Sequence, residues 1–287
     1  MVAFEVPEVD YTQYSNRQLV AIPLAVLLVA LVVLAGWWAM TGSPVALGVD
    51  FAGGSELTVE TELSQQEIRN SFEEPVVSVQ GVQGEANQYI VTFDSSNIES
   101  IRGTANDNGQ MELLRSGSTS PVFGAENQRL AVYGVLIAFG GMSLLAFALF
   151  RTFVPSIAIV ISAFSDIVIP LAIMNLLGIR LSLGTVAALL MLIGYSVDSD
   201  ILLNNHVLRR SGGFYESTYR AMRTGVTMTL TSIAAMSVMA VTAALFGIDL
   251  MAAIGLVLVL GLSADLMNTY MLNVTLLRWY KYEGVKR

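Results

Sequence analysis

Long apolar stretches separated by short polar links dominate the pattern of this chain. Six of them are long enough to cross the hydrocarbon core of a bilayer, which takes about 20 residues of helix. The first has three acids against one arginine before it, which favours an uncleaved membrane helix over a signal peptide. The pattern therefore predicts a polytopic α-helical membrane protein with six transmembrane helices. The predicted spans are residues 19–40, 130–150, 153–177, 181–204, 224–246 and 251–277.

Between the first two spans, residues 43–128 change to a mixed polar pattern. Residues 56–62 alternate like a strand, and Ser64-Gln65-Gln66-Glu67 has the spacing of a capping box that opens a helix reaching about Phe72. A second such spacing at 96–99 predicts another helix. Further strands are predicted at 76–79, 88–93 and 111–114. The order strand–helix–strand–strand–helix–strand predicts a small ferredoxin-like α+β domain.

Charge is scarce and unevenly spread. Only 13% of residues are charged, against about 25% in soluble domains. Residues 43–128 hold 13 acids and 3 arginines, and lysine occurs only at Lys281 and Lys286. So acidic and lysine-poor a segment suggests a cell with very high salt, where charges are screened beyond about 3 Å at 1 M. A halophilic archaeon is therefore the expected source, and the alternative is an ordinary acidic extracytoplasmic domain.

The composition also limits the chemistry of the chain. It has no cysteine, and its single histidine is His206. These absences argue against a disulfide and against a metal centre built on thiolate or imidazole ligands. We expect neither a metal, nor a cofactor, nor a nucleic-acid partner.

The basic residues predict the orientation in the cell membrane. With both termini in the cytoplasm, 10 of the 15 basic residues lie on the cytoplasmic side, as the positive-inside rule requires. The cytoplasmic ends are then residues 1–18 and 278–287, and the acidic domain at 43–128 is extracytoplasmic. The ten are Arg17, Arg151, Arg209, Arg210, Arg220, Arg223, Arg278, Lys281, Lys286 and Arg287.

Four carboxylates fall inside predicted spans: Asp166, Asp198, Asp200 and Asp265. Each would cost about 3 kcal/mol if it faced lipid, so they are expected to face protein or water and to act on protons or ions. Asp198 and Asp200 point about 200° apart on a helix, so they cannot share one face. Asp198 is the preferred acid, with Asn205 on its stripe, and Asp200 could instead contact a second protein or lie nearer the cytoplasmic surface.

The fifth span carries a basic residue at its start and a polar stripe behind it. Arg223 is followed on one side of the helix by Thr224, Thr227, Thr231 and Thr242. We expect this stripe to face the interior of the bundle, where Arg223 could reach Asp198 and act with it in a relay. The alternative is an anchor that snorkels to the headgroups. Asp166 and Asp265 are secondary relay candidates, with structural packing as their alternative role.

Three segments resemble motifs of the SecD/SecF family of the resistance-nodulation-division (RND) superfamily, in its archaeal SecF form. The segment with Gly48, Asp50, Phe51, Gly53 and Gly54 is similar to the motif after the first helix. The segment from Gly194 and Tyr195 to Asp198 is similar to the fourth-helix motif, and Tyr219 to Thr224 is similar to the opening of the fifth helix.

The resemblance implies a half-transporter of six helices with a ferredoxin-like outer domain. The implied role is to assist protein export through the Sec translocon channel with the proton or ion gradient. The implied partners are SecD, that channel, the translocating polypeptide and the lipid bilayer. Asp198 resembles the family's fourth-helix acid, and Arg223 its basic counterpart. Bacterial members usually have Asn-Asp here, which would place their acid over Ser199, so Asp198 and Asp200 both stay candidates.

Three other functions remain open as alternatives. The chain could be a passive scaffold for SecD, with inert carboxylates. It could be an RND-type exporter of small molecules or lipids, although about 85 residues of polar outer domain leave little room for a large apolar pocket. An intramembrane aspartyl protease is disfavoured, because Ser196-Val197 stands before Asp198 where such enzymes have Gly-x-Gly. We therefore expect a transport component and not an enzyme.

Overall fold

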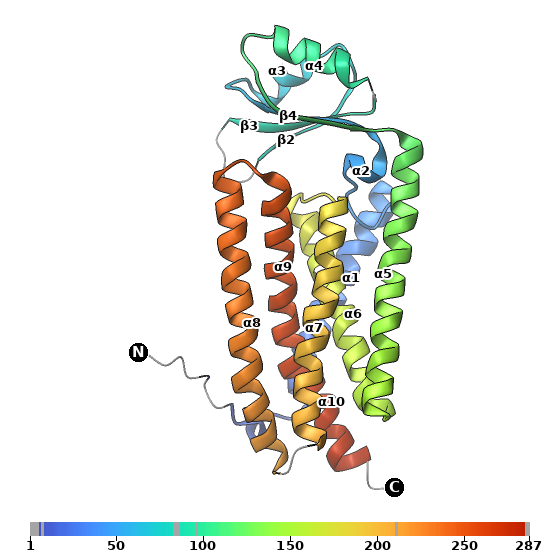
Figure 1. Cartoon of the computed structure of the whole chain (residues 1–287), viewed down its shortest axis with the longest axis vertical. Coiled ribbons are helices and arrows are strands. Elements are labelled where there is room, and N and C mark those ends of the chain that lie inside the picture. Colours follow the sequence, from blue (N-terminus) through green and yellow to red (C-terminus); the bar gives the residue numbers. More distant parts are fainter. Residues whose placement is uncertain (1–5, 7–8, 83–86, 96, 210–211, 285–287) are drawn as a thin grey trace.

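The chain folds into a long helical bundle with a small sheet domain at one end (Figure 1). The computed structural model describes residues 6, 9–82, 87–95, 97–209 and 212–284, and Ser96, Arg210, Lys286 and Arg287, used in the predictions above, lie outside them. Within this part, six helices are long and apolar enough to cross a membrane, as predicted. They are Asn16–Thr41, Pro121–Phe150, Phe153–Leu177, Leu183–Arg209, Phe214–Leu245 and Asp249–Tyr282.

The first five of these helices are α1, α5, α6, α7 and α8, and they begin and end where local chemistry allows it. Ser15 caps α1 in a capping box with Gln18, and Ser120 caps α5, with Pro121 at its first position. Gly178, with a φ of +71°, ends α6 in the left-handed conformation. α5 begins nine residues before the predicted span and α8 ten residues before, so both extend beyond their apolar stretches.

The last span is not one regular helix. It runs as α9 (Asp249–Met267), a π-helical segment η2 (Asn268–Asn273), α10 (Val274–Trp279) and a final π-helical segment η3 (Tyr280–Gly284). The wider π turn is uncommon and occurs frequently at functional sites. At the end of the bundle remote from the sheet, Arg278 of α10 donates to the carbonyls of Tyr11 and Tyr14, which tie the 3₁₀ turn η1 (Tyr11–Gln13) to the last span.

The sheet domain has the predicted ferredoxin-like order. Its four strands pair antiparallel in the order β2-β3-β1-β4. The two helices cover the face that points away from the bundle (Figure 1). The predicted last strand at 111–114 is longer in the structure. The elements are β1 (Gly54–Glu60), α3 (Gln65–Asn70), β2 (Val76–Gly81), β3 (Gln88–Phe93), α4 (Ile98–Asp107) and β4 (Glu112–Thr119).

The two faces of the sheet differ because side chains alternate along each strand. Leu57, Val91 and Phe93 point to the helices, where they pack with Ile68 and Ile101 in a closed apolar core. The opposite face is polar, with Glu56, Thr58, Ser78 and Thr92 toward the bundle. The domain therefore has one apolar core of its own and a polar surface over the membrane helices.

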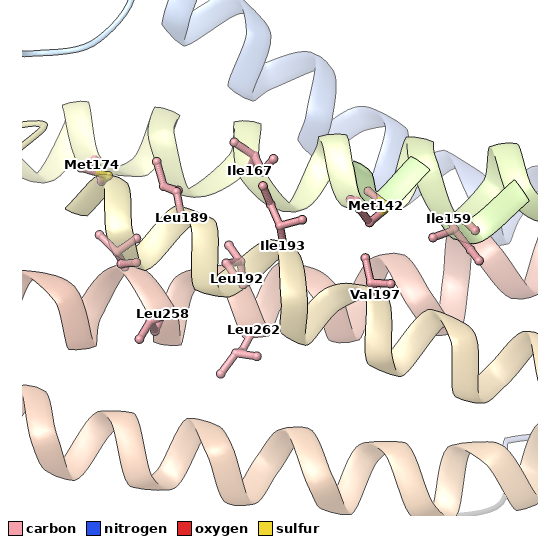
Figure 2. Close-up of a cluster of buried hydrophobic side chains, with 14 residues drawn as sticks. Met142, Ile159, Ile167, Met174, Leu189, Leu192, Ile193, Val197, Leu258 and Leu262 are labelled. Atoms are coloured by element: carbon pink, nitrogen blue, oxygen red, sulfur yellow. The ribbon is translucent and has the colours of Figure 1, made fainter. Parts of the chain in front are cut away.

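Helices α6, α7 and α9 form the centre of the bundle. Figure 2 shows their apolar side chains interdigitating, with Leu189, Leu192 and Ile193 of α7 between Ile167 of α6 and Leu258 of α9. Gly261 on α9 allows this approach, since a Cβ there would lie 2.2 Å from a methyl carbon of Leu192. Helix α8 lies at the side of the bundle (Figure 1), and few residues of its apolar stretch are buried.

Candidate functional site

Helix α7 divides its polar residues between two faces. Ser196, Ser199 and Asp200 are buried, whereas Asp198 is exposed and Tyr195 is 39% exposed. The helical repeat of 3.6 residues explains the division, because residues 196, 199 and 200 share one side and residue 198 points away. The structure therefore separates the two candidate acids, with Asp200 inside the chain's own bundle and Asp198 on its outer surface.

Asp200 is fully buried and accepts hydrogen bonds from two residues of the π-helical segment η2. Its Oδ1 accepts a hydrogen bond from Thr269 Oγ1 at 2.9 Å and another from Asn273 Nδ2 at 2.8 Å. Its Oδ2 has no hydrogen-bond partner among the residues that the structure describes. The idea that this acid contacts a second protein or lies near the cytoplasmic surface is therefore wrong for this conformation, because its side chain is covered by the chain itself.

Asp265 belongs to α9 and lies next to Asp200 of α7. The hydroxyl of Ser199 lies 2.9 and 2.8 Å from its two carboxylate oxygens, and the hydroxyl of Thr269 lies 3.2 Å from Oδ1. A hydroxyl has one proton to donate. The Thr269 proton can therefore point to Asp200 or to Asp265, but not to both at once. This places one switchable donor between two buried carboxylates.

Asp166 of α6 completes the group. Its Oδ2 accepts from Ser196 Oγ at 2.5 Å and its Oδ1 from Asn268 Nδ2 at 2.6 Å. Its side chain is 1% exposed. We call Asp166, Asp200 and Asp265 the carboxylate cluster. Helices α6, α7 and α9 each contribute one acid to it.

The charge of the cluster has no basic counterpart among its hydrogen-bond partners, which are all hydroxyls and amides. Both ion pairs found in the described residues lie elsewhere, at Arg180–Glu56 and Arg220–Glu216. An uncompensated buried carboxylate is expensive and normally takes up a proton or finds a cation. The cluster is therefore suited to hold protons within the membrane part of the chain.

Metal binding at this cluster is not supported by its arrangement. Within the described part of the chain, no group of three or more acidic, histidine or cysteine side chains is placed to hold a metal ion. The amide oxygens of Asn268 and Asn273 are buried and accept no hydrogen bond from another described residue. A protonated carboxyl group could donate to such an oxygen, which fits protons better than a metal.

Arg223 and its threonine stripe lie on the exposed side of α8, so the prediction that they face the interior of this chain's bundle is wrong. Arg223, Thr224, Thr227, Thr231 and Thr242 are all exposed. Gly225 is packed against Leu202 and Tyr270, and a residue two positions away points about 200° from it. Arg223 therefore points away from α7, and no ion pair joins it to Asp198. We call these five residues the α8 stripe.

The remaining candidates on α7 do not join the cluster. Asn205 is half-buried, and no hydrogen bond of its side chain is seen. Gly194 is exposed, with nothing within 4 Å of where a Cβ would stand. Gly194, Tyr195 and Asp198 thus line an open side of α7 in this single chain.

The glycine-rich segment after the first span is a junction and not a simple turn. Residues Val49–Ala52 form the one-turn helix α2, and Phe51 is 1% exposed. Asp50 Oδ2 accepts from the backbone N–H of Leu183, the first residue of α7, at 3.1 Å. Gly48 donates to the carbonyl of Leu181 at 2.8 Å. The segment therefore holds the outer end of α7.

The two glycines that close this segment lie close to the backbone of other elements. Gly53 and Gly54 have φ values of +80° and +100°, which L side chains rarely adopt. A Cβ on Gly53 would lie 2.7 Å from Pro121 Cα, and one on Gly54 would lie 2.2 Å from the carbonyl oxygen of Phe93. Only glycine fits where α5, the sheet and α2 meet.

Sequence reasoning missed several residues of the site. Ser196, Ser199 and Asn273 were not singled out, although Asn273 stands four residues after Thr269 and eight after Asp265, on one helical stripe. That spacing was a readable signal. Arg180 was not identified because its role depends on contacts with strands about 90 to 120 residues away.

Comparison with known proteins gives consistent results. Residues 100–283 match the family described as protein export membrane protein SecD/SecF, C-terminal. Residues 38–62 match the SecD/SecF GG motif, which contains the glycine-rich junction. The matched regions together include the sheet domain's junction, its last strand and five of the six long helices.

Individual relatives agree over the whole length. The chain is 65% identical to the protein-export membrane protein SecF of Haloferax volcanii, over 100% of both chains. It is 62% identical to that of Haloquadratum walsbyi, over 100% of both, and 41% identical to that of Methanolacinia petrolearia, over 96% of this chain and 98% of the relative. The first two relatives fit the predicted halophilic source.

A solved structure shares the fold. The crystal structure of SecDF, a translocon-associated membrane protein from Thermus thermophilus, superposes with a TM-score of 0.77 at 20% identity. The match covers 98% of this chain and 40% of that one. The chain thus corresponds in fold to less than half of the SecDF polypeptide.

Proposed function

Because the chain belongs to the SecD/SecF family of protein-export membrane proteins, as one of its SecF members, we propose that it acts with a SecD partner and uses the proton gradient to promote polypeptide translocation. Its place in Sec protein export follows from the relatives. So does its class, a membrane transport component and not an enzyme. The gradient, the translocon channel and the translocating polypeptide belong to the proposal.

We place the sheet domain outside the cell and both termini in the cytoplasm. The basic side chains Arg151, Arg209, Arg220 and Arg278 stand at helix ends remote from the sheet. The sheet domain itself is acidic. The positive-inside rule favours this orientation.

The observation that carries the proposal is the carboxylate cluster, three acids buried inside the membrane bundle with no basic partner in the described part of the chain. Intramembrane carboxylates are expensive and usually mark proton or ion pathways. Asp200 and Asp265 share the Thr269 hydroxyl. When that hydroxyl turns from one carboxylate to the other, the carboxylate that loses the hydrogen bond would take up a proton. The carboxyl group that gains the hydrogen bond would release one.

Asp198 and Arg223 act in this proposal at a surface that SecD covers. Both are exposed in this single chain although they lie in membrane helices. A lipid-facing charge is costly, so a partner protein is the favourable environment for each. Protonation of Asp198 from the outer side would remove one negative charge from that interface and change how α7 packs against SecD.

The energy available sets a limit on the work per proton. One charge that crosses 100 mV supplies about 2.3 kcal/mol. Several such steps could bias the movement of an unfolded chain, whereas one step could not unfold a stable domain, which takes about 5–15 kcal/mol. The account therefore requires an unfolded client.

The sheet domain offers two edges for such a client. In the order β2-β3-β1-β4, strands β2 and β4 each pair on one side only among the described residues. Strand addition uses backbone hydrogen bonds, so it tolerates varied sequences. One pocket of the sheet domain is lined mainly by polar groups, including Glu60, Thr61, Glu62 and Asn87. That lining disfavours the alternative of a small-molecule or lipid exporter.

The test is export of a Sec-dependent reporter in cells whose only copy carries Asp200→Asn or Asp198→Asn. Asp107→Asn is the matched control, because Asp107 is exposed on the sheet domain. Each variant must be present in the membrane with SecD. The proposal expects lost export for the membrane variants and normal export for the control. Normal export in all three would favour the passive scaffold.

A further inference from the structure

Arg180 connects the membrane bundle to three strands of the sheet. It lies in the short loop between α6 and α7, at the end of the bundle that carries the sheet. Its guanidinium donates to Thr92 Oγ1 of β3 at 2.5 Å and to Ser78 Oγ of β2. It also lies 3.7 Å from Glu56 Oε2 of β1. One side chain thus joins β1, β2 and β3.

The contact between Arg180 and the sheet is partly shielded from water, so its strength depends on how well its donors and acceptors are aligned. The side chains of Arg180 and Glu56 are 18% and 30% exposed. Burial raises the pKa of Glu56, whereas Arg180 and Arg115 lower it, and Asp50 and Asp249 raise it further. A planar guanidinium with five donors can bridge several acceptors in fixed directions, which an ammonium cannot do.

The same loop is held from below by backbone hydrogen bonds. Leu181 donates to the carbonyl of Ala46 at 2.7 Å, and its own carbonyl accepts from Gly48. Asp50 receives the N–H of Leu183, where α7 begins. The outer end of α7 is therefore fixed to the glycine-rich junction on one side and to the sheet on the other.

Helix α7 extends this connection to the acids. Asp200 lies 17 residues after Leu183, about 25 Å along a helix that rises 1.5 Å per residue. A packed helix moves as a rigid element, so a shift near Asp200 displaces its outer end as well. Arg180 is the side chain at that end which contacts the polar face of the sheet on three strands.

We propose that Arg180 is a positioning residue that fixes the sheet domain to the α6–α7 loop, so that movement of α7 is transmitted to the sheet. The proposal rests on the proposed function only for its consequence in export. The rigid connection itself can be measured without export. Neither the family motifs nor the carboxylate cluster includes this residue.

The experiment measures the distance between the sheet and the bundle in the purified complex with SecD. The chain has no cysteine, so nitroxide labels can be placed at Glu99→Cys on α4 and Leu245→Cys at the end of α8, both exposed. Double electron–electron resonance gives the distribution of their separation. Arg180→Ala should broaden that distribution, and it should reduce export of a Sec-dependent reporter in cells.

The matched control is Arg102→Ala, which removes the same charge from an exposed site on α4. It should leave distances and export unchanged. If Arg180→Ala fails to accumulate, the double variant Ser78→Ala with Thr92→Val decides, because it removes two acceptors on the sheet and keeps both charges. Broadening in either variant supports the proposal. An unchanged distribution overturns it, and so does equal broadening in the control.

The two proposals can fail separately. Normal export with Asp198→Asn and Asp200→Asn would refute the proton role and leave the distance result standing. A narrow distance distribution with Arg180→Ala would refute the connection, even if the carboxylate variants stop export.

Discussion

Removal of the hydroxyl of Thr269 tests the link between two buried acids. Thr269→Val keeps the side-chain shape and removes the donor that lies 2.9 Å from Asp200 and 3.2 Å from Asp265. Each acid keeps another partner, Asn273 for Asp200 and Ser199 for Asp265. The variant should therefore fold, with one shared hydrogen bond fewer.

The size of the expected loss of export follows from the single hydrogen bond that Thr269→Val removes. A hydrogen bond to a charged group contributes about 1.5–3 kcal/mol, and the shared donor counts once. If the same free energy is lost from the proton-transfer step, the rate of gradient-driven export falls roughly ten- to a hundred-fold, since 1.36 kcal/mol is a factor of ten. The expected loss of export is then much larger than any loss of folded protein.

Thr275→Val is the matched control on the same span. Thr275, at the start of α10, is buried, and its hydroxyl donates to the carbonyl of Met271 in the preceding turn, η2, at 2.6 Å. The assay is the export rate of a Sec-dependent reporter, normalised to the amount of each variant in the membrane. Equal export by Thr269→Val and Thr275→Val would refute the reasoning, because the bridging position would then have no special role.

Three further predictions concern the sheet domain and its junction. Gly54→Ala should prevent accumulation of folded protein, because the new Cβ would lie 2.2 Å from the Phe93 carbonyl oxygen at a φ of +100°; normal amounts in a membrane immunoblot would contradict this. Burial raises the pKa of Glu56 above its ordinary 4.5, so this group's contribution to stability should decrease as pH rises from 4.5 through the folded-state value. The change of melting temperature with pH, measured for wild type and for Glu56→Gln, tests this. The same change with pH in both proteins would exclude Glu56 as its source. The 13 acids of residues 43–128 should make the purified protein lose thermal stability at low salt through self-repulsion, and full stability there would count against adaptation to high salt.

The membrane spans and the order of the sheet domain could be predicted from the sequence because both depend on local patterns. Apolar length identifies a span whatever its neighbours are, and alternation and the capping box of Ser64 and Glu67 identified strands and a helix. The second predicted capping box, at 96–99, marked the right place for α4, but the N-cap of α4 is Asn97, which makes no side-chain cap hydrogen bond. The starts of α5 and α8 were missed because these helices continue into polar sequence. Apolar length alone could not show that continuation.

The division of roles between Asp198 and Asp200 could not be predicted in the same way. Helical geometry showed that they face opposite directions, but it could not show which direction leads inward. That depends on where α6 and α9 pack, and their residues are 30 or more positions away in sequence. The α8 stripe was assigned to the interior because it is polar, whereas in this single chain it is exposed.

The proposed function requires the carboxylate cluster to take up and release protons. Infrared difference spectroscopy of the purified complex with SecD during a pH jump observes this directly, through the C=O stretch of carboxylic acid groups. The account predicts carboxylic acid bands that change with pH in the wild-type protein and lose a component in Asp200→Asn, while Asp107→Asn matches wild type. Bands that Asp200→Asn leaves unaltered would contradict it and would make the buried acids packing elements of a scaffold.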